Sequence, residues 1–159
     1  MTSGSESTSL DLSFSLVTEA EAPVDVDGGD LEALATFVLA NEEAAGFWEV
    51  TVALVADDRL QQIHRDFMGI DTPTDIMTFP NGEPGVEPHG GELVISVDHA
   101  RTQASAWGLS AEEEIRFLVT HGLLHLLGWR DETDEQRQAM LKRQQHLFDE
   151  WQRGTPEAL

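Results

Sequence analysis

The first half of the chain changes from an alternating to a helical pattern of apolar positions, and back again. Leu10–Val17 alternates apolar and polar side chains, which is typical of a strand with one buried face. Apolar residues recur at helical spacing in Asp30–Ala45 and predict an amphipathic helix. Phe47–Val55, rich in β-branched and aromatic residues, predicts a second strand. A second helical pattern begins at Asp57 and ends at Gly69.

The middle of the chain predicts two short strands followed by a helix. The first strand is Asp75–Phe79, which follows a proline-containing approach. Two prolines and three glycines make Pro84–Gly91 a loop, and the apolar, β-branched segment Glu92–Val97 predicts the next strand. Asp98 is placed to cap a helix that runs to Trp107.

Two capping patterns predict the last two helices. Ser110 and Glu113 form a capping box at the start of a long helix that has few polar positions after Arg116. Such a helix must be covered on most sides. Thr133 and Gln136 repeat the pattern at the start of a charged C-terminal helix. The sequence therefore predicts an α+β fold: a mixed sheet of about four strands, with helices packed around one central buried helix.

The length of 159 residues fits one domain with its own core. We predict a disordered tail over residues 1–9, a single domain over 10–153 and a short tail over 154–159. No run of apolar residues approaches the length of a membrane span, and no basic segment precedes an apolar core near the start. We therefore expect a cytoplasmic protein with no membrane partner.

The predicted central helix ends in the segment HGLLHLLGWRD, His121–Asp131. His121 and His125 are four residues apart, so they stack on one helix face about 6 Å apart along the axis. Gly128 permits a sharp turn that can bring Asp131 back toward them. Two imidazoles and a carboxylate, with water in a fourth position, form the ligand set of a catalytic zinc site. We predict one Zn²⁺ per chain, although this ligand set also suits Ni²⁺, Mn²⁺ or Fe²⁺.

The competing interpretation is that the histidines are core residues. A single histidine on an apolar helix face is more often a core residue than a ligand. Two of them, at His121 and His125, are harder to explain in that way, because each buried ring needs a hydrogen-bond partner that apolar neighbours do not offer. The metal site is therefore the preferred hypothesis.

Cysteine content and charge restrict the chemistry further. The chain has no cysteine, which excludes disulfide partners and thiolate metal ligands. The net charge is −21, from 30 acidic and 9 basic residues. Charge alone argues against a nucleic-acid partner. Adaptation of the surface to high salt is an alternative explanation, because screening in concentrated salt removes the long-range repulsion. That hypothesis predicts a melting temperature that rises strongly with molar salt.

Three ordered motifs resemble those of the YbeY family of zinc-dependent endoribonucleases, which mature bacterial ribosomal RNA. His121–Asp131 resembles the family signature HGxLHLxGYDH. Pro73–Pro80, PTDIMTFP, resembles PTDVLSFP, and Gly91–Ser96, GELVIS, resembles the strand GDIxIS. The resemblance implies a single-strand-directed, metal-dependent endoribonuclease that processes the 3′ end of the small-subunit RNA and takes part in ribosome quality control. The implied partners are ribosomal RNA and the ribosome or small subunit, with a ribosomal protein or a GTPase as a further candidate.

Two positions depart from the family pattern. The third histidine of the signature falls on Asp131, which is still a competent zinc ligand. The arginine in the stretch resembling YRGKDxPTD falls on Met68, so its positive charge must come from elsewhere. No residue stands out as a general base beyond a metal-bound water. Five residues are candidates for RNA binding, with surface or turn roles as the alternative for each: Arg65, Arg101, Arg130, Thr74 and Asp75.

Two other functions remain open. The spacing also resembles the H-E-x-x-H helix of metalloproteases, but Gly122 stands where their glutamate acts as general base. A peptidase-like hydrolase is therefore the second candidate. The third is a non-catalytic, ribosome-associated zinc protein in which the metal ties the central helix to the turn that follows it.

Overall fold

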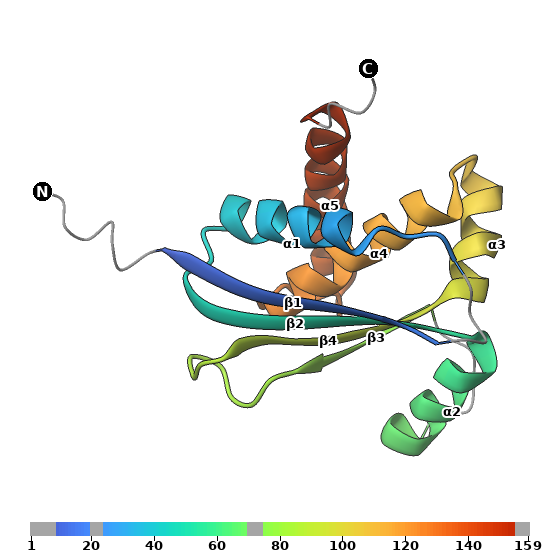
Figure 1. The fold of residues 1–159 in the computed structure, drawn as a ribbon, viewed down its shortest axis with the longest axis horizontal. Coiled ribbons are helices and arrows are strands. Elements are labelled where there is room, and N and C mark those ends of the chain that lie inside the picture. The colour runs from blue at the N-terminus through green and yellow to red at the C-terminus, as the bar shows by residue number, and fades with distance from the viewer. Residues whose placement is uncertain (1–8, 20–23, 70–74, 155–159) are drawn as a thin grey trace, which may run out of the picture.

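The computed structural model describes residues 9–19, 24–69 and 75–154. Within these ranges the chain forms four strands and five helices (Figure 1). In chain order they are β1 (Leu10–Thr18), α1 (Gly28–Asn41), β2 (Gly46–Val55), α2 (Asp57–Met68), β3 (Ile76–Pro80), β4 (His89–Ser96), α3 (Val97–Trp107), α4 (Ala111–Leu126) and α5 (Asp134–Gly154).

The four strands form one mixed sheet in the order β1-β2-β4-β3. β1 pairs with β2 and β2 with β4 in parallel, whereas β3 pairs with β4 in antiparallel orientation. In Figure 1, α1, α4 and α5 lie on one side of the sheet and α2 lies on the other. No helix in the described ranges is both long and apolar enough to cross a membrane.

Two separate apolar clusters fill the two faces. The main core joins the sheet to α1, α4 and α5 and contains fully buried residues such as Leu34, Leu93 and Leu123. A smaller cluster under α2 consists of Val55, Leu60, Met77 and Val94. Because alternate residues of a strand point to opposite faces, the adjacent residues Leu93 and Val94 serve different clusters.

The predicted α+β fold with its mixed four-stranded sheet and central helix is confirmed. α4 contacts α1, α3, α5, β3 and β4. The capping box at its start is present, with the Ser110 side chain accepting from the Glu113 backbone N–H and the Glu113 carboxylate accepting from the Ser110 N–H. Gly122 faces the sheet, where a Cβ would come within 2.6 Å of Leu93 Cδ2.

Three local predictions were wrong. α1 ends at Asn41 and not at Ala45, because the chain must turn there to place Gly46 beside Leu10 in the sheet. β4 begins at His89 within the predicted loop, since pairing with β2 extends its start.

The third error concerns the cap of α3. The Ser96 hydroxyl, and not the Asp98 carboxylate, caps this helix by accepting from the His99 N–H at 3.1 Å. Asp98 instead accepts from the Asp57 N–H at 2.7 Å, at the start of α2, where the N-cap Ala56 offers no side-chain acceptor. A neighbouring helix therefore supplies the acceptor that the N-cap of α2 lacks.

Candidate metal centre and the adjoining pocket

His121, His125 and Asp131 converge at the end of α4. One ligand atom from each lies within 4.8 Å of the other two, the separation expected of groups that could hold one metal ion. Asp131 Oδ2 lies 3.2 Å from His125 Nε2 and 3.9 Å from His121 Nε2. All three side chains are partly exposed, so the centre is open to a ligand on one side.

Hydrogen bonds to the far side of each ring select the tautomer that can bind a metal. His125 Nδ1 lies 3.1 Å from the carbonyl oxygen of Trp129, and His121 Nδ1 lies 3.0 Å from Gln144 Oε1. The Gln144 amide nitrogen donates to the Phe117 carbonyl at 3.2 Å, which orients the amide oxygen toward His121. Both Nδ1 atoms therefore face acceptors and carry the proton. In that tautomer each Nε2 directs its lone pair toward Asp131 Oδ2, an arrangement that a shared divalent cation would satisfy.

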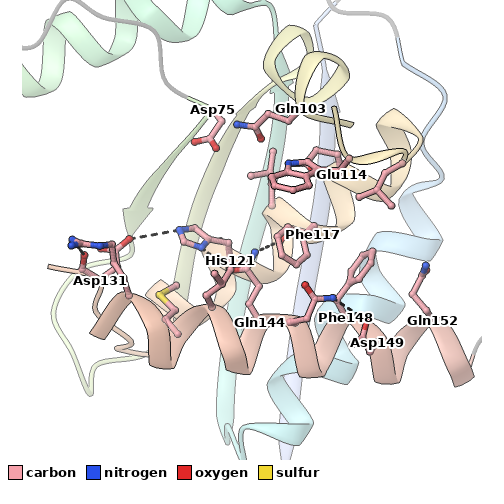
Figure 2. A pocket seen from close by; sticks show the side chains of 17 residues that line it. Asp75, Gln103, Glu114, Phe117, His121, Asp131, Gln144, Phe148, Asp149 and Gln152 are labelled. Atoms are coloured by element: carbon pink, nitrogen blue, oxygen red, sulfur yellow. Dashed lines mark hydrogen bonds and ion pairs between the residues drawn. The ribbon is translucent and has the colours of Figure 1, made fainter. Parts of the chain in front are cut away.

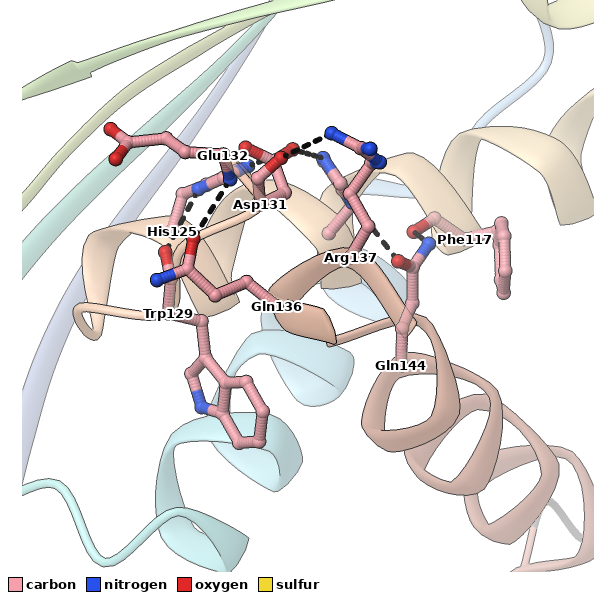
Figure 3. A network of polar contacts seen from close by, with 9 residues as sticks. Phe117, His125, Trp129, Asp131, Glu132, Gln136, Arg137 and Gln144 are labelled. Carbon is pink, nitrogen blue, oxygen red and sulfur yellow. Dashed lines mark hydrogen bonds and ion pairs between the residues drawn. The ribbon is translucent and has the colours of Figure 1, made fainter. Parts of the chain in front are cut away.

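The turn after α4 delivers Asp131. Gly128 adopts a φ of +107°, which a side chain would strain, and the Trp129 N–H donates to the Leu124 carbonyl at 3.0 Å. The Asp131 carbonyl accepts from Arg137 Nη1 at 3.2 Å (Figure 3). The start of α5 thus holds the Asp131 backbone while leaving its carboxylate directed at the histidines.

A second set of contacts ties the same turn to α1. Trp129 Nε1 donates to Glu42 Oε1 at 3.0 Å, and Glu42 Oε2 accepts from Arg143 Nε at 2.5 Å. Glu42 is the C-cap of α1 and Arg143 lies on α5. The turn that carries Asp131 is therefore tied to the end of α1, which is itself tied to α5.

A pocket of about 790 Å³ opens beside the metal centre, between α3, α4 and α5. In Figure 2, Asp75, Gln103 and Glu114 lie across the pocket from the α5 side chains, and Asp131 lies at one end. Its lining residues are Asp75, Gln103, Trp107, Leu109, Glu114, Phe117, Leu118, His121, Asp131, Arg137, Met140, Leu141, Gln144, Gln145, Phe148, Asp149 and Gln152. His121 and Asp131 belong to both features, so the pocket and the metal centre form one continuous site.

Glu114 is the unusual residue of this pocket. Its side chain is 4% exposed, and within the described part of the chain no hydrogen bond or ion pair to its carboxyl group is found. Burial, together with the negative charge of Asp75, raises the pKa of Glu114 to about 7. A carboxyl group with this environment in a cleft is a candidate functional group.

The structure places the predicted RNA-binding residues at different distances from this site. Asp75 lines the pocket, whereas Arg65, Arg101 and Arg130 do not. Arg65 lies on α2, where it pairs with Asp66 at 3.7 Å, and Arg130 pairs with Glu132 at 2.7 Å. Thr74 lies outside the described residues. An RNA-binding role for these residues stays a prediction.

Sequence reasoning missed three residues of the site: Glu114, Arg137 and Gln144. For Glu114 and Gln144 a signal was present, since each is a polar residue on the apolar stripe of its helix. Arg137 carried no such signal because it follows the start of an exposed, charged helix. Its contact with Asp131 depends on how the turn folds back.

Comparisons with known proteins agree on one family. A family model described as Endoribonuclease YbeY matches residues 17–152. The protein named Endoribonuclease YbeY from Thermus thermophilus is 42% identical over 113 residues, covering 69% of this chain and 81% of that protein. The protein of the same name from Bacillus velezensis is 36% identical over 132 residues, covering 77% of this chain and 84% of that protein. The solution structure of TM1509 from Thermotoga maritima superposes with a TM-score of 0.58 at 26% identity, over 91% of this chain and 95% of that one.

Proposed function

This chain belongs to the Endoribonuclease YbeY family, and from that premise we propose that it is a metal-dependent endoribonuclease that acts in ribosomal RNA processing. The observation that carries the proposal is the cluster of His121, His125 and Asp131 at the rim of a pocket. Both imidazole rings are held in the tautomer that a metal requires, and the pocket gives a ligand access to the centre.

Zinc is the metal that we propose for this site. Two histidine nitrogens and one carboxylate oxygen match the three-ligand sets of catalytic zinc sites, and no thiolate is available in the sequence. When bound, the ion supplies a Lewis acid for a phosphate oxygen and lowers the pKa of a water molecule. Gln144 and the Trp129 carbonyl orient the two rings, as partners of metal-ligating histidines do in general.

Arg137 is our candidate for the positive charge that Met68 does not provide. Within the described part of the chain, it is the only arginine or lysine that lines the pocket. Its Nη1 donates to the Asp131 carbonyl, so the guanidinium stays beside the metal ligands. Its Nη2 pairs with Asp134, and the N–H groups that these two contacts leave can bind a phosphate oxygen. Met68, by contrast, is 59% exposed at the end of α2.

The substrate and partners are proposed from the family. We propose that the chain cuts single-stranded RNA near the 3′ end of the small-subunit RNA, that it acts in the cytoplasm, and that it associates with the ribosome or small subunit. A role in ribosome quality control, and a ribosomal protein or GTPase that supplies specificity, belong to the same proposal.

The site argues against the peptidase alternative. In an H-E-x-x-H helix the glutamate follows the first histidine, at the position of Gly122 here. A side chain at Gly122 points into Leu93 and Ile76 of the sheet, and a carboxylate there has no path to a water at the metal. This geometry favours the ribonuclease over the peptidase.

Metal content and RNA cleavage measured on the same samples test the proposal. We expect about one zinc per chain in the purified wild type by elemental mass spectrometry, and loss of both zinc and cleavage of labelled single-stranded RNA in His121→Ala. The control is His146→Ala, which changes an exposed histidine of α5. A wild type that binds no metal after zinc is added back contradicts the mechanism. A zinc-loaded wild type that leaves RNA intact, while Asp131→Ala lowers only the melting temperature, supports the non-catalytic alternative.

A further inference from the structure

The pocket continues well beyond the metal ligands. Its volume of about 790 Å³ falls within the usual range of small-ligand sites. His121 and Asp131 account for one end, while the end of α3 and the middle of α5 line the rest (Figure 2). A phosphate at the metal centre therefore leaves the larger part of the pocket to another portion of the ligand.

One wall of the pocket presents an aromatic ring to solvent. Trp107, the last residue of α3, is 75% exposed. Phe117 and Phe148 pack edge to face with ring centroids 5.3 Å apart, so these two rings are already engaged with one another. Trp107 remains available to stack on a flat group, an interaction that single-stranded nucleic-acid binding proteins use widely.

The charged groups of the pocket are mainly carboxylates. The buried Glu114 carboxyl lines the pocket without a partner among the described residues, and Asp75 and Gln103 lie on the same side of it (Figure 2). This carboxyl group is free to accept hydrogen bonds, so a ligand that donates to it inside the pocket gains affinity. The ionisable and charged groups that share the pocket with Glu114 are Asp75, His121, Asp131, Arg137 and Asp149.

The charge of the pocket excludes a second phosphate as its occupant. Among the described residues that line it, only Arg137 is basic, and that residue lies beside Asp131 at the metal end. Asp75 and Asp149 repel an anion from the remainder, and Glu114 adds to this repulsion when it is ionised. The chemistry of the pocket instead suits a neutral, planar group that carries donors.

We propose that this pocket binds one nucleobase of the RNA, next to the phosphate at the metal centre, and that it selects guanine through Glu114. Guanine carries N1–H and N2–H₂ donors side by side, and one carboxylate can accept from both. Uracil offers one N–H donor between two carbonyl acceptors, which would face the carboxylates unfavourably. The inference rests on the proposed function only in taking RNA as the ligand.

The ionisation of Glu114 agrees with this assignment. Burial and the charge of Asp75 raise the pKa of Glu114 to about 7, so the free carboxyl group is close to half protonated at neutral pH. A base that donates two hydrogen bonds stabilises the ionised form and draws the pKa back down.

Binding of short oligonucleotides tests the inference without requiring cleavage. The probes are fluorescent 2′-O-methyl oligonucleotides of about eight residues, within the usual size of single-strand sites: all uridine, uridine with one central guanosine, and uridine with one central inosine, which lacks the N2 amino group. Anisotropy is measured with zinc-loaded protein in about 1 M KCl, where screening weakens charge repulsion, and gels confirm that the probes stay intact. We expect the guanosine probe to bind about tenfold more tightly than the uridine probe, with inosine between them.

Variants separate the two contacts. Glu114→Gln should remove the preference for guanosine while Glu112→Gln, a matched change two residues away on α4, preserves it. Trp107→Ala should weaken binding of all three probes by roughly tenfold or more, and Trp107→Phe should restore most of that loss. Melting curves show whether each variant is folded.

Two outcomes overturn the inference: equal affinity of the wild type for the three probes, or a guanosine preference that survives Glu114→Gln. A wild type that selects guanosine but cleaves no RNA supports the base site and contradicts the proposed function. Cleavage of RNA without any base preference supports the proposed function and contradicts the base site.

Discussion

Gly122 shows at the scale of one residue how closely α4 lies on the sheet. An added Cβ would lie 2.6 Å from Leu93 Cδ2 and 3.1 Å from Ile76 Cδ1, both on strands that form the floor beneath the metal ligands. The neighbouring residue, His121, points to the opposite side, into the pocket. The absence of a side chain at Gly122 therefore allows the ligand helix to sit close to β3 and β4.

Replacing Gly122 with alanine should destabilise the fold. Overpacking against Leu93 typically costs about 1–3 kcal/mol in the free energy of unfolding, which urea titration measures. Gly154→Ala is the control, because a Cβ at the end of α5 meets nothing within 4 Å. Equal stability of the two variants would show that α4 has room to move away from the sheet.

Glu114 should make the stability of the wild type fall with pH. The folded state keeps its proton up to about pH 7, whereas the ordinary value of 4.5 applies to the unfolded chain. The folded state therefore binds more protons between these values, and the free energy of unfolding falls as the pH rises through this window. Glu114→Gln should remove that fall. At about pH 8 the free energy of unfolding of the variant should exceed that of the wild type by on the order of 2 kcal/mol.

The adjacent Glu113 provides a control of opposite sign. The hydrogen bond from the Ser110 N–H lowers the pKa of Glu113. The ionised Glu113 carboxylate therefore stabilises the fold at neutral pH, and this stabilisation is lost as the pH falls. Urea titrations of Glu113→Gln and Glu114→Gln across the same pH series compare the two. Parallel curves for the wild type and Glu114→Gln would contradict the raised pKa of Glu114.

At the scale of the elements, α5 completes a site whose ligands all precede it. Gln144 joins α5 to α4 by donating to the Phe117 carbonyl while it accepts from His121 Nδ1. Arg137 and Gln136, in the first turns of α5, bond the backbone of the segment that contains Asp131. The docking of one helix thus sets the orientation of two metal ligands.

Gln144→Leu should weaken metal binding without removing a ligand. Loss of the acceptor on His121 frees the ring and its tautomer, and such changes typically cost about 10- to 100-fold in metal affinity. Competition with a zinc-binding dye measures the affinity. Gln145→Leu is the matched control, since that side chain also lines the pocket but bonds Asp149. Equal affinities for the two variants would remove Gln144 from the metal centre.

The helices, the strands and the convergence of the three proposed metal ligands were predictable because their signals are local. The spacing of His121, His125 and Asp131 depends on a single helix and the turn after it, so sequence pattern alone could bring them together. The roles of Gln144 and Glu114 depend on how α5 and α3 pack beside α4, which no local pattern encodes. The same reason explains the early end of α1, where sheet register overrides a favourable helical composition.

At the scale of the whole molecule, the net negative charge opposes the binding of RNA that we propose for the site. The net charge of −21 repels RNA, whereas the proposed RNA site combines one arginine, Arg137, with a pocket suited to a neutral base. Several ion pairs are exposed, such as that between Arg137 and Asp134, and contribute little to stability. On this proposal the affinity for RNA comes from the metal centre, from Arg137 and from base contacts.

Salt should therefore stabilise the protein and strengthen its binding of RNA. Raising KCl from about 0.1 to 1 M shortens the screening length from about 10 Å to 3 Å and weakens the repulsion among the acidic groups. We expect the melting temperature to rise by roughly 5 °C or more, and the affinity for single-stranded RNA to hold or rise, whereas basic RNA-binding proteins lose affinity. Calorimetry and anisotropy over a KCl series measure both, and a melting temperature that does not change with salt would count against adaptation of the surface to salt.

The division of the core by the sheet has a consequence for how this sequence can diverge. Leu60 and its neighbours under α2 share no side-chain cluster with α4, so substitutions there can accumulate without disturbing the metal ligands. The face covered by α4 and α5 has no such freedom, because the same helices build the core and orient the ligands. Met68 lies at the end of α2, on the side where drift is tolerated, and Arg137 lies on the constrained side. A positive charge that α2 does not carry can therefore be supplied from α5 without repacking either cluster.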